Sequence, residues 1–380
     1  MRRWLEDAYA DHPGELDLSL IPGALSEHEA LWAWAKEQCL PTFGPYEDAM
    51  SANEPTLFHT RLSLSMNLSR VLPRRLLAEL SELKLPLASE EGFVRQILGW
   101  REFVRHVHLR TEGHRLSVKG PSAIAPTLGD AGYAQWRACE GKEEAQWTSR
   151  GWREGEAEAS AQGWRPPPQS VEDGGAQPQQ NQAGEQVGLS APLEPSELPP
   201  VFWGTPSGLR CLDSVVADVW REGWSHHITR LMVLSNWATL LGLSPRALTD
   251  WFWVAYVDAF DWVVEPNVLG MSTFAVGPLM TTKPYVSGAA YVNKMSDYCE
   301  GCAFSPHTKP KRGDERPLCP MTSAYWDTLR RNAGLLAGNP RLSMPLASER
   351  KRSEAQREAD QARTTALRAA LMAGERVTPP

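Results

Sequence analysis

Apolar side chains recur every three or four residues over most of the chain, which is the spacing that gives a helix one buried face. In the segment 90–109, for example, Phe93, Ile97, Trp100 and Val104 fall on the same side of a helix. No set of segments with the alternating period of β-strands accompanies this pattern. The sequence therefore predicts an all-α fold.

Start and stop signals divide the pattern into separate helices. Ser26, with Glu29 three residues later, has the arrangement of a capping box and predicts a helix start. Residues 41–46 contain two prolines and a glycine and predict a turn. Further helices are expected from residue 73, from residue 90, over 212–243 as one long helix or a closely spaced pair, over 245–262, over 325–336 and over 348–374.

One long stretch lacks this pattern. Residues 139–199 are rich in Gln, Gly, Glu and Pro, and they bury too little apolar surface to offset the entropy of ordering. Because helical patterns resume afterwards, we expect a disordered insertion within one helical domain made of residues 23–138 and 200–346. Residues 1–22 show little order of their own, and residues 347–380 predict a charged C-terminal helix or tail.

Composition narrows the function classes. The net charge of −7 argues against a basic coat for nucleic acid, although a local basic groove stays possible. No signal peptide opens the chain and no apolar run reaches membrane length, so we expect a soluble intracellular protein without a membrane partner, of unknown compartment. The 16 tryptophans suggest a flat aromatic ligand or an electron path, with a Trp-rich core as the plainer alternative.

Four cysteines have the spacing of a metal site. Cys299 and Cys302 place two thiols on one turn, Cys319 follows at a loop-sized distance, and Cys211 could supply a fourth sulfur. Four thiolates suit zinc or an iron–sulfur cluster, and the spacing favours neither. Unligated core cysteines are the alternative.

Polar residues within the predicted helices offer further chemistry. His226 and His227 lie in the predicted helix 212–243, where one imidazole facing a cavity could donate a proton near neutral pH. A buried structural histidine is the commoner case. Asp258 and Asp261 are spaced for one helical face among tryptophans, so they need a partner or a ligand donor such as a flavin or a sugar hydroxyl, unless they lie at the surface.

Two segments could contact phosphates. Residues 60–63 (T-R-L-S) offer hydroxyl and backbone donors to a phosphate. Arg95, Arg101 and Arg105 mark one face of the predicted helix from residue 90, which would meet either a polyanion or solvent.

Five motifs together resemble a known family. They are F-G-P-Y-E-D-A-M from residue 43, E-G-F-V-R-Q-I-L-G-W-R-E-F-V-R from residue 91, H-H-I-T-R-L-M-V-L from residue 226, V-D-A-F-D-W-V-V-E-P-N-V-L-G-M-S from residue 257 and M-S-D-Y-C-x-x-C from residue 295. On these motifs the chain resembles the photolyase/cryptochrome superfamily, specifically the branch of iron–sulfur bacterial cryptochromes and prokaryotic (6-4) photolyases. The resemblance covers residues 16–137 and 202–346.

The resemblance implies an all-helical FAD-binding domain with a [4Fe–4S] cluster, and it favours iron over zinc. The cluster ligands would be Cys211, Cys299, Cys302 and Cys319. The implied cofactor-binding residues are Thr60, Leu62, Ser63, Gln96, Trp100, Glu102, Arg230, Asp258, Asp261 and Asn267. The implied catalytic residues are His227, then His226, with Tyr285 and Tyr291 near the pocket. The implied electron relay contains Trp251 and Trp203, and it is altered where Phe252 replaces a tyrosine of some relatives.

The resemblance also implies an activity. Photoexcited reduced FAD would donate an electron to a pyrimidine (6-4) photoproduct in UV-damaged DNA, and we expect a monomer. The family's N-terminal antenna domain has no counterpart here, so residues 1–22 would be the remnant of an interdomain connector and no antenna chromophore is expected. The alternatives are a cryptochrome-like photoreceptor without repair activity, an iron–sulfur nucleic-acid-binding module without flavin, and an inactive remnant.

Overall fold

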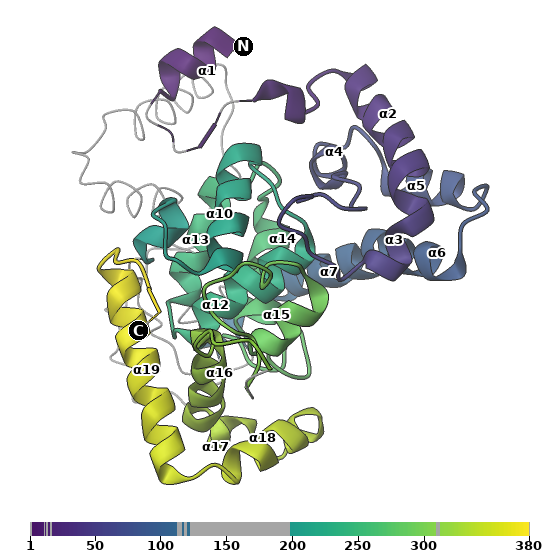
Figure 1. Cartoon of the computed structure of the whole chain (residues 1–380). Helices are drawn as coiled ribbons and strands as arrows, with labels where there is room; N and C mark the ends of the chain where they lie inside the picture. Colours follow the sequence, from purple (N-terminus) through teal and green to yellow (C-terminus); the bar gives the residue numbers. More distant parts are fainter. Residues whose placement is uncertain are drawn as a thin grey trace, which may run out of the picture.

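The protein folds as an assembly of helices, in agreement with the predicted all-α class (Figure 1). The structure is a computed structural model that describes residues 2–10, 12, 14–15, 17–111, 116–117, 120–121, 198–308 and 312–379. Within these ranges the only strands are β1 (Leu116–Ser117) and β2 (Gly120–Pro121), which pair antiparallel. No described helix has the length and apolarity needed to cross a membrane.

Most helices are short, and several follow one another without a loop. In chain order the helices are α1 (Arg2–Ala8), η1 (Leu18–Leu20), α2 (Leu25–Trp34), η2 (Ala35–Cys39), α3 (Leu40–Tyr46), α4 (Ser63–Asn67), α5 (Pro73–Leu80), α6 (Leu87–Val94), η3 (Arg95–Trp100), α7 (Arg101–Thr111), η4 (Pro200–Trp203), α10 (Arg210–Glu222), α11 (His227–Thr229), η5 (Arg230–Ser235), α12 (Asn236–Leu240), α13 (Pro245–Ala255), α14 (Asp261–Glu265), η6 (Pro266–Ser272), α15 (Ala289–Met295), α16 (Pro320–Arg331), α17 (Ala333–Leu336), η7 (Pro340–Leu342), α18 (Ser343–Arg350) and α19 (Glu354–Met372).

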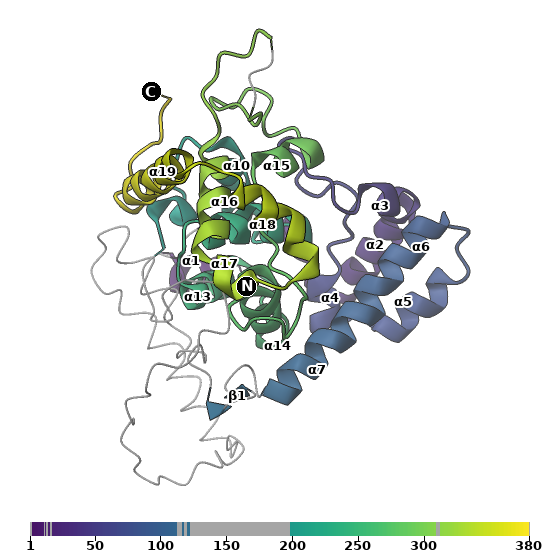
Figure 2. The same cartoon turned by 90° about the horizontal axis from the view of Figure 1, so that it is seen from below.

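Two apolar clusters organise these helices. The larger lies among α10 to α16 and contains Trp237, Trp251 and Phe202, all fully buried. The smaller lies among α2 to α7, which stand to one side of the larger body in both views, and contains Trp32 and Phe93 (Figures 1 and 2). Helix α14 packs against α7 and joins the two parts.

Four helical stretches contain a wider π turn, namely η2, η3, η5 and η6. Such turns are rare and are frequent at functional sites. The first of them explains why the predicted turn at residues 41–46 is wrong. Helix α3 runs through Pro41 because η2 interrupts the regular hydrogen-bond ladder directly before the residue that has no N–H.

The predicted segment 212–243 is a pair of helices rather than one. Helix α10 ends at Gly223, whose φ of +58° is a left-handed conformation that favours glycine. The backbone N–H of Val257 donates to the carbonyl of Gly223 at 2.9 Å, and a Cβ on Gly223 would lie 2.8 Å from that valine's side chain. His226 therefore lies in the break, not within a long helix, and caps the start of α11.

The predicted helix over 245–262 is also divided, and the expectation that Asp258 and Asp261 share one helical face is wrong. Helix α13 ends at Ala255, Tyr256 is extended, and α14 begins only at Asp261. Asp258 is buried in the intervening loop, whereas the side chain of Asp261 is exposed. Contacts distant in sequence, described below, outweigh the local helical pattern here.

Several other boundaries differ by a few residues. The helix expected at Ser26 begins at Leu25, because Glu27 rather than Glu29 accepts from the backbone N–H groups of Gly23 and Ala24, at 2.7 and 2.8 Å. The helix expected from residue 90 begins with α6, after Pro86. The helix expected over 325–336 begins five residues earlier, with α16.

The two ends of the described chain differ in how they pack. Near the N-terminus, where no element was expected, α1 buries no side chain. Near the C-terminus, α19 packs along α16 and places Leu367 and Leu371 in the larger cluster. The predicted insertion 139–199 lies outside the described residues except for Leu198 and Pro199, which are buried.

Candidate functional site

A buried carboxylate, Asp258, lies at the centre of the first candidate site. It receives two hydrogen bonds from Arg230 on η5, at 3.1 Å from Nη1 and 2.9 Å from Nη2. Ser63, the first residue of α4, donates to it at 2.5 Å. The guanidinium of Arg230 also lies 4.2 Å from the ring centroid of Tyr256. An ion pair from η5 and a hydroxyl from α4 thus hold the carboxylate in place, while the ring of Tyr256 packs on the guanidinium.

Arg101 extends this network as a half-buried cation. Its Nη1 donates to the amide of Asn67 at 3.2 Å, and its guanidinium lies 4.8 Å from the ring of Trp262. Among the described residues no carboxylate lies within 4.0 Å of it. Burial lowers the pKa of Arg101 because a cation loses hydration there. An anionic group of a ligand would relieve this cost.

The backbone around α4 is strained. Leu57, Arg61 and Ser69 have φ of 44°, 54° and 55°, a conformation that is uncommon for residues with a Cβ. Arg61 is held there by an ion pair with Glu222 at 2.6 Å. Strain of this kind persists where surrounding contacts determine the backbone, and it clusters at ligand sites. It occurs here in the T-R-L-S segment that the sequence assigns to phosphates.

The structure brings only part of the predicted cofactor set together. Ser63, Arg230 and Asp258 form the Asp258 network, and Thr60 precedes Ser63 by three residues in the chain. Leu62 is buried in the smaller cluster, Trp100 packs against a small cluster that includes Met280, and Gln96 donates to Glu47 at 2.6 Å. The amide of Asn267 donates to its own helix, and the side chains of Glu102 and Asp261 are exposed. The two exposed carboxylates do not join the network.

The expected basic face also divides. Arg95 pairs with Glu91 at 2.5 Å and Arg105 with Glu102 at 3.4 Å, and all four side chains are exposed. Only Arg101 turns inward. Residues 95 and 105 therefore form the solvated face that the sequence offered as one alternative.

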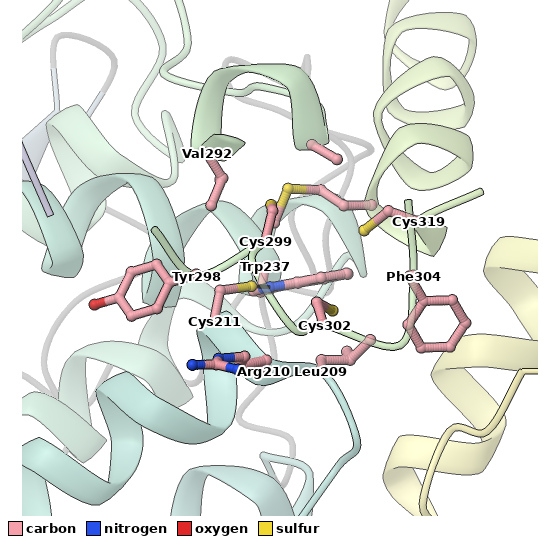
Figure 3. Close-up of a pocket in the computed structure, with 12 residues that line it drawn as sticks. Leu209, Arg210, Cys211, Trp237, Val292, Tyr298, Cys299, Cys302, Phe304 and Cys319 are labelled. Atoms are coloured by element: carbon pink, nitrogen blue, oxygen red, sulfur yellow. Dashed lines mark hydrogen bonds between the residues drawn. The ribbon is translucent and has the colours of Figure 1, made fainter. Parts of the chain in front are cut away.

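The four predicted cysteine ligands line one cavity (Figure 3). Cys211 lies in the first turn of α10, and Cys319 is the residue before α16. Cys299 and Cys302 come from the loop after α15, where Gly301 has a φ of +69° and a Cβ would lie 2.7 Å from Arg210. The tight turn at this glycine lets both sulfurs face the same space.

Neighbouring groups hold the sulfur site in shape. Arg316 donates to the carbonyls of Cys299 and Cys302 at 3.0 and 3.1 Å, and the indole of Trp237 donates to the sulfur of Cys211 at 3.4 Å. Burial raises the pKa of Cys211 to about 12 and that of Cys299 to about 11, and the nearby thiols add to the effect. Deprotonation of these two thiols at physiological pH therefore requires a cationic group in the cavity.

The spacing of these sulfurs distinguishes between metal groups. A single zinc ion bound at about 2.3 Å would hold its sulfurs about 3.8 Å apart. Among the described residues, no three of these sulfurs lie within 4.8 Å of one another. They therefore lie farther apart than the sulfurs of a bound zinc ion would.

A group of histidines, which we call the imidazole cluster, consists of His59, His226 and His227. His226 and His59 are buried, whereas the side chain of His227 is 42% exposed and its Nε2 lies 3.9 Å from the carboxylate of Asp48. Burial lowers the pKa of His226 well below its usual value, so this ring is neutral at physiological pH. His227 is therefore the better placed of the two predicted catalytic histidines for exchanging a proton with a ligand.

The two predicted tyrosines lie near this exposed histidine. Tyr285 and Tyr291 are half-buried, the latter on α15. Burial raises the pKa of Tyr291 to about 12, and the nearby Asp48 and Tyr285 contribute to the increase. The phenol of Tyr291 is thus a neutral hydrogen-bond donor at physiological pH.

The two predicted relay tryptophans are connected through a third. The rings of Trp251 and Trp220 lie 6.1 Å apart, and those of Trp220 and Trp203 lie 5.8 Å apart. The indole N–H groups of Trp220 and Trp251 donate to the same carbonyl, that of Phe202, at 2.9 and 2.8 Å. Tyr256, which contacts Arg230, lies 5.9 Å from Trp251. An aromatic path therefore leads from the Asp258 network to Trp203.

Several of these residues were missed by sequence reasoning. Trp220 and Tyr256 gave no signal beyond the general abundance of aromatic residues. His59 directly precedes the T-R-L-S segment, and Asp48 lies in the first family motif, but neither position indicated a partner. The contacts of His59 and Asp48 with the start of α11 join segments more than a hundred residues apart, whereas Trp220 and Tyr256 contact residues closer in sequence.

Comparison with known proteins places these features in context. No family model matches the chain. The chain is 29% identical over 354 residues to a (6-4) photolyase of Agrobacterium fabrum, covering 92% of this chain and 55% of the relative. An uncharacterized protein of Acanthamoeba polyphaga mimivirus is 39% identical over 66 residues, which is 17% of this chain and 54% of that protein. The chain thus spans about half the length of the curated relatives it matches.

Among solved structures, the chain aligns with a crystal structure of a bacterial class III photolyase from Agrobacterium tumefaciens. The TM-score is 0.48 at 15% identity, over 87% of this chain and 60% of that one.

Proposed function

Because the chain belongs to the photolyase/cryptochrome superfamily, we propose that it is a light-dependent DNA-repair flavoprotein that acts, as a monomer, on pyrimidine (6-4) photoproducts in UV-damaged DNA. The observation that carries this proposal is the Asp258 network, which joins an ion pair, a hydroxyl and the half-buried cation of Arg101. Buried charge arranged in this way suits a ligand with both polar ring edges and phosphates.

FAD is the ligand that we assign to this network. Arg101 and the donors of residues 60–63 would bind its phosphates, and Arg230 with Asp258 would face the polar edge of its ring system. Bound FAD, when reduced and excited by blue light, supplies an electron to the lesion. The protein's contribution is to hold the ring, exclude water and supply protons at fixed positions.

His227 is the residue that we assign to proton donation. Its ring is exposed at the edge of the site, and its Nε2 lies 3.9 Å from the carboxylate of Asp48. The phenols of Tyr285 and Tyr291 would orient the lesion by hydrogen bonding. His226, which is buried and neutral, would support His227 rather than act first.

The proposal is tested by absorption and by repair. We expect the purified protein to contain flavin and to repair (6-4) lesions in DNA under blue light, and not in the dark. Protein that binds FAD but fails to repair under light would contradict the repair activity, and it would favour the photoreceptor alternative.

The aromatic path would re-reduce the flavin. Trp251, Trp220 and Trp203 lie at successive ring distances of about 6 Å, which suits stepwise electron transfer towards Tyr256 and the Asp258 network. Because Trp203 does not appear in direct ring contact with Trp251 in the described structure, Trp220 would be the connecting member.

Replacing Trp220 with phenylalanine should slow photoreduction severalfold, because a benzene ring is much harder to oxidise than an indole. The fold should tolerate the change, since Trp251 still donates to the carbonyl of Phe202. The measurement is the decay of oxidised-flavin absorbance under blue light with an external donor. Trp32→Phe is the matched control, because that buried indole lies in the smaller cluster. Equal rates for both variants would exclude Trp220 from the path.

The sulfur cavity would hold a [4Fe–4S] cluster on Cys211, Cys299, Cys302 and Cys319. Four thiol donors in an apolar lining match the donor set of such a cluster, and their wide spacing disfavours a single zinc ion. We assign the cluster a structural role, because its ligands join α10, the loop after α15 and the start of α16.

Substitution of a cysteine tests this assignment. Wild-type protein isolated without oxygen should contain about four iron atoms and four inorganic sulfides per chain. Cys211→Ser should lose most of both and unfold at lower temperature. Cys39→Ser is the matched control, because Cys39 is buried outside the sulfur cavity. One zinc per chain without inorganic sulfide would overturn the assignment.

A further inference from the structure

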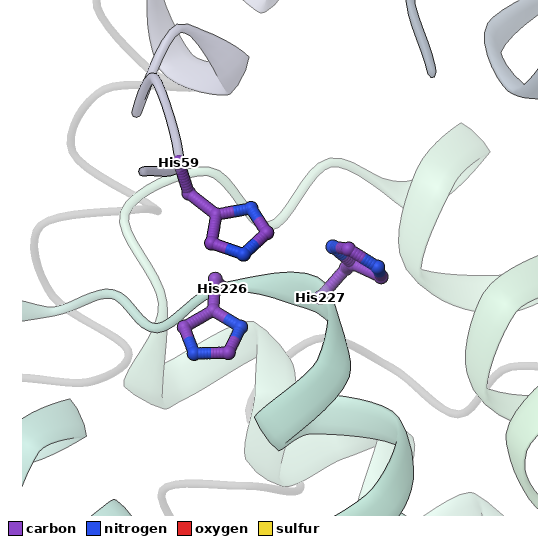
Figure 4. A group of neighbouring side chains, drawn as sticks. All are labelled: His59, His226 and His227. Atoms are coloured by element: carbon purple, nitrogen blue, oxygen red, sulfur yellow. The ribbon is translucent and has the colours of Figure 1, made fainter. Parts of the chain in front are cut away.

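The imidazole cluster has a geometry of its own beside the Asp258 network. His59 comes from the loop before α4, and His226 and His227 come from the start of α11 (Figure 4). The rings of His59 and His226 are stacked, with centroids 4.3 Å apart and an interplanar angle of 3°, and His227 lies edge-on at 5.1 Å from His59. One ligand atom from each ring lies within 4.8 Å of the other two.

Several ring nitrogens in this cluster lack partners. Nε2 of His59 and both ring nitrogens of His226 are buried and have no hydrogen-bond partner among the described residues. A buried polar atom without a partner costs about 1–3 kcal/mol. Three such atoms in contacting rings indicate that the cluster is built for a ligand that binds nitrogen lone pairs.

The charge state of the cluster suits a cation. Burial lowers the pKa of both His59 and His226 well below the usual value, and the neighbouring histidines and Arg230 lower it further. Neutral imidazoles keep a lone pair free, and they are the commonest protein ligands of transition metals. The carboxylate of Asp48 adds a negative charge on the exposed side.

We propose that His59, His226 and His227 bind a single divalent transition-metal ion of borderline softness, such as Zn²⁺. An ion bound tetrahedrally at about 2.0–2.1 Å from each nitrogen would hold the nitrogens about 3.4 Å apart. The rings would therefore have to approach by no more than about 1.4 Å from the 4.8 Å limit. His59 in a loop and His226 at a helix boundary can make that adjustment by side-chain rotation. The fourth position faces Asp48 or water.

Occupation of this site would regulate the proposed repair reaction. A metal ion takes the lone pair of His227, so this ring can no longer exchange a proton with a lesion. The ion would thus inhibit repair without displacing flavin. Metal binding itself requires neither light nor DNA, so its failure is distinguishable from failure of the proposed function.

Zinc titration of the protein as isolated, with flavin and cluster present, tests the site. We expect calorimetry to show one saturable Zn²⁺ site per chain, and metal analysis after dialysis to give the same stoichiometry. His59→Ala should lower this affinity by at least about tenfold, since even changes outside the ligand shell cost about 10–100-fold. His59→Gln, which preserves volume, should show the same loss if His59→Ala folds poorly.

His106→Ala is the matched control, because this exposed imidazole on α7 lies outside the cluster. It should bind zinc as the wild type does. Wild-type protein without a saturable site, or a His59 variant that binds as tightly as the wild type, would overturn the proposal.

Discussion

Replacing Arg246 with methionine is expected to lower the free energy of unfolding by about 3–5 kcal/mol, because it removes a buried cation that pairs with two buried carboxylates. Arg246 is 3% exposed, and it binds Glu265 from α14 with two hydrogen bonds at 2.8 and 3.0 Å. It also binds Asp250 on its own helix at 2.7 Å. Urea unfolding at constant salt concentration measures the change.

The Arg246–Glu265 ion pair lies next to the candidate site, so its loss should affect function as well as stability. Arg246 and Glu265 lie on the two helices that flank the loop carrying Asp258. Arg75→Met is the matched control, because Arg75 also binds two carboxylates but is 43% exposed. We expect less than about 1 kcal/mol for that exposed group. If both variants lost a similar free energy of unfolding, burial would not be what makes the ion pairs of Arg246 strong.

Replacing His227 with asparagine is expected to reduce light-dependent repair by about 10²–10⁴-fold, the range that a positioned proton donor contributes. Asparagine keeps a polar side chain of similar reach but cannot carry the proton. The variant should bind flavin and undergo photoreduction as the wild type does, because the aromatic path does not include His227. Repair of (6-4) lesions per absorbed photon is the measurement.

His108→Asn serves as the control for this substitution, because His108 lies on α7 outside the imidazole cluster. Full repair by the His227 variant would show that a group other than His227 donates the proton. Loss of photoreduction in that variant would show instead that the substitution disturbs the flavin site.

The all-α class could be predicted from the sequence because the spacing of apolar residues directly indicates which face of each helix is buried. Phe93, Ile97 and Val104, which the pattern assigned to one face, are all buried. The breaks at Gly223 and Tyr256 were not accessible, because each is stabilised by a contact across the chain. The N–H of Val257 pairs with Gly223, and Asp258 pairs with Arg230.

The candidate sites show the same division. The cysteines were identified as a set because the chemistry of thiols and their clustering are visible in the sequence. The sequence singled out Arg101 only as part of a basic helix face and gave no reason to select His59, because what distinguishes each residue is its surroundings in the fold. Arg101 lacks a carboxylate among its described neighbours, and the Nε2 of His59 lacks a hydrogen-bond partner among the residues described. Whether a side chain has such a partner is decided only when the chain folds.

The carbonyl of Phe202 has a further consequence for the aromatic path. It is the hydrogen-bond acceptor of both Trp220 and Trp251, and an amide oxygen is a very weak base. An indole that has lost an electron there would therefore keep its proton and stay a radical cation. The positive hole would remain free to move between the two rings until it reached Trp203, whose N–H is not tied to that oxygen.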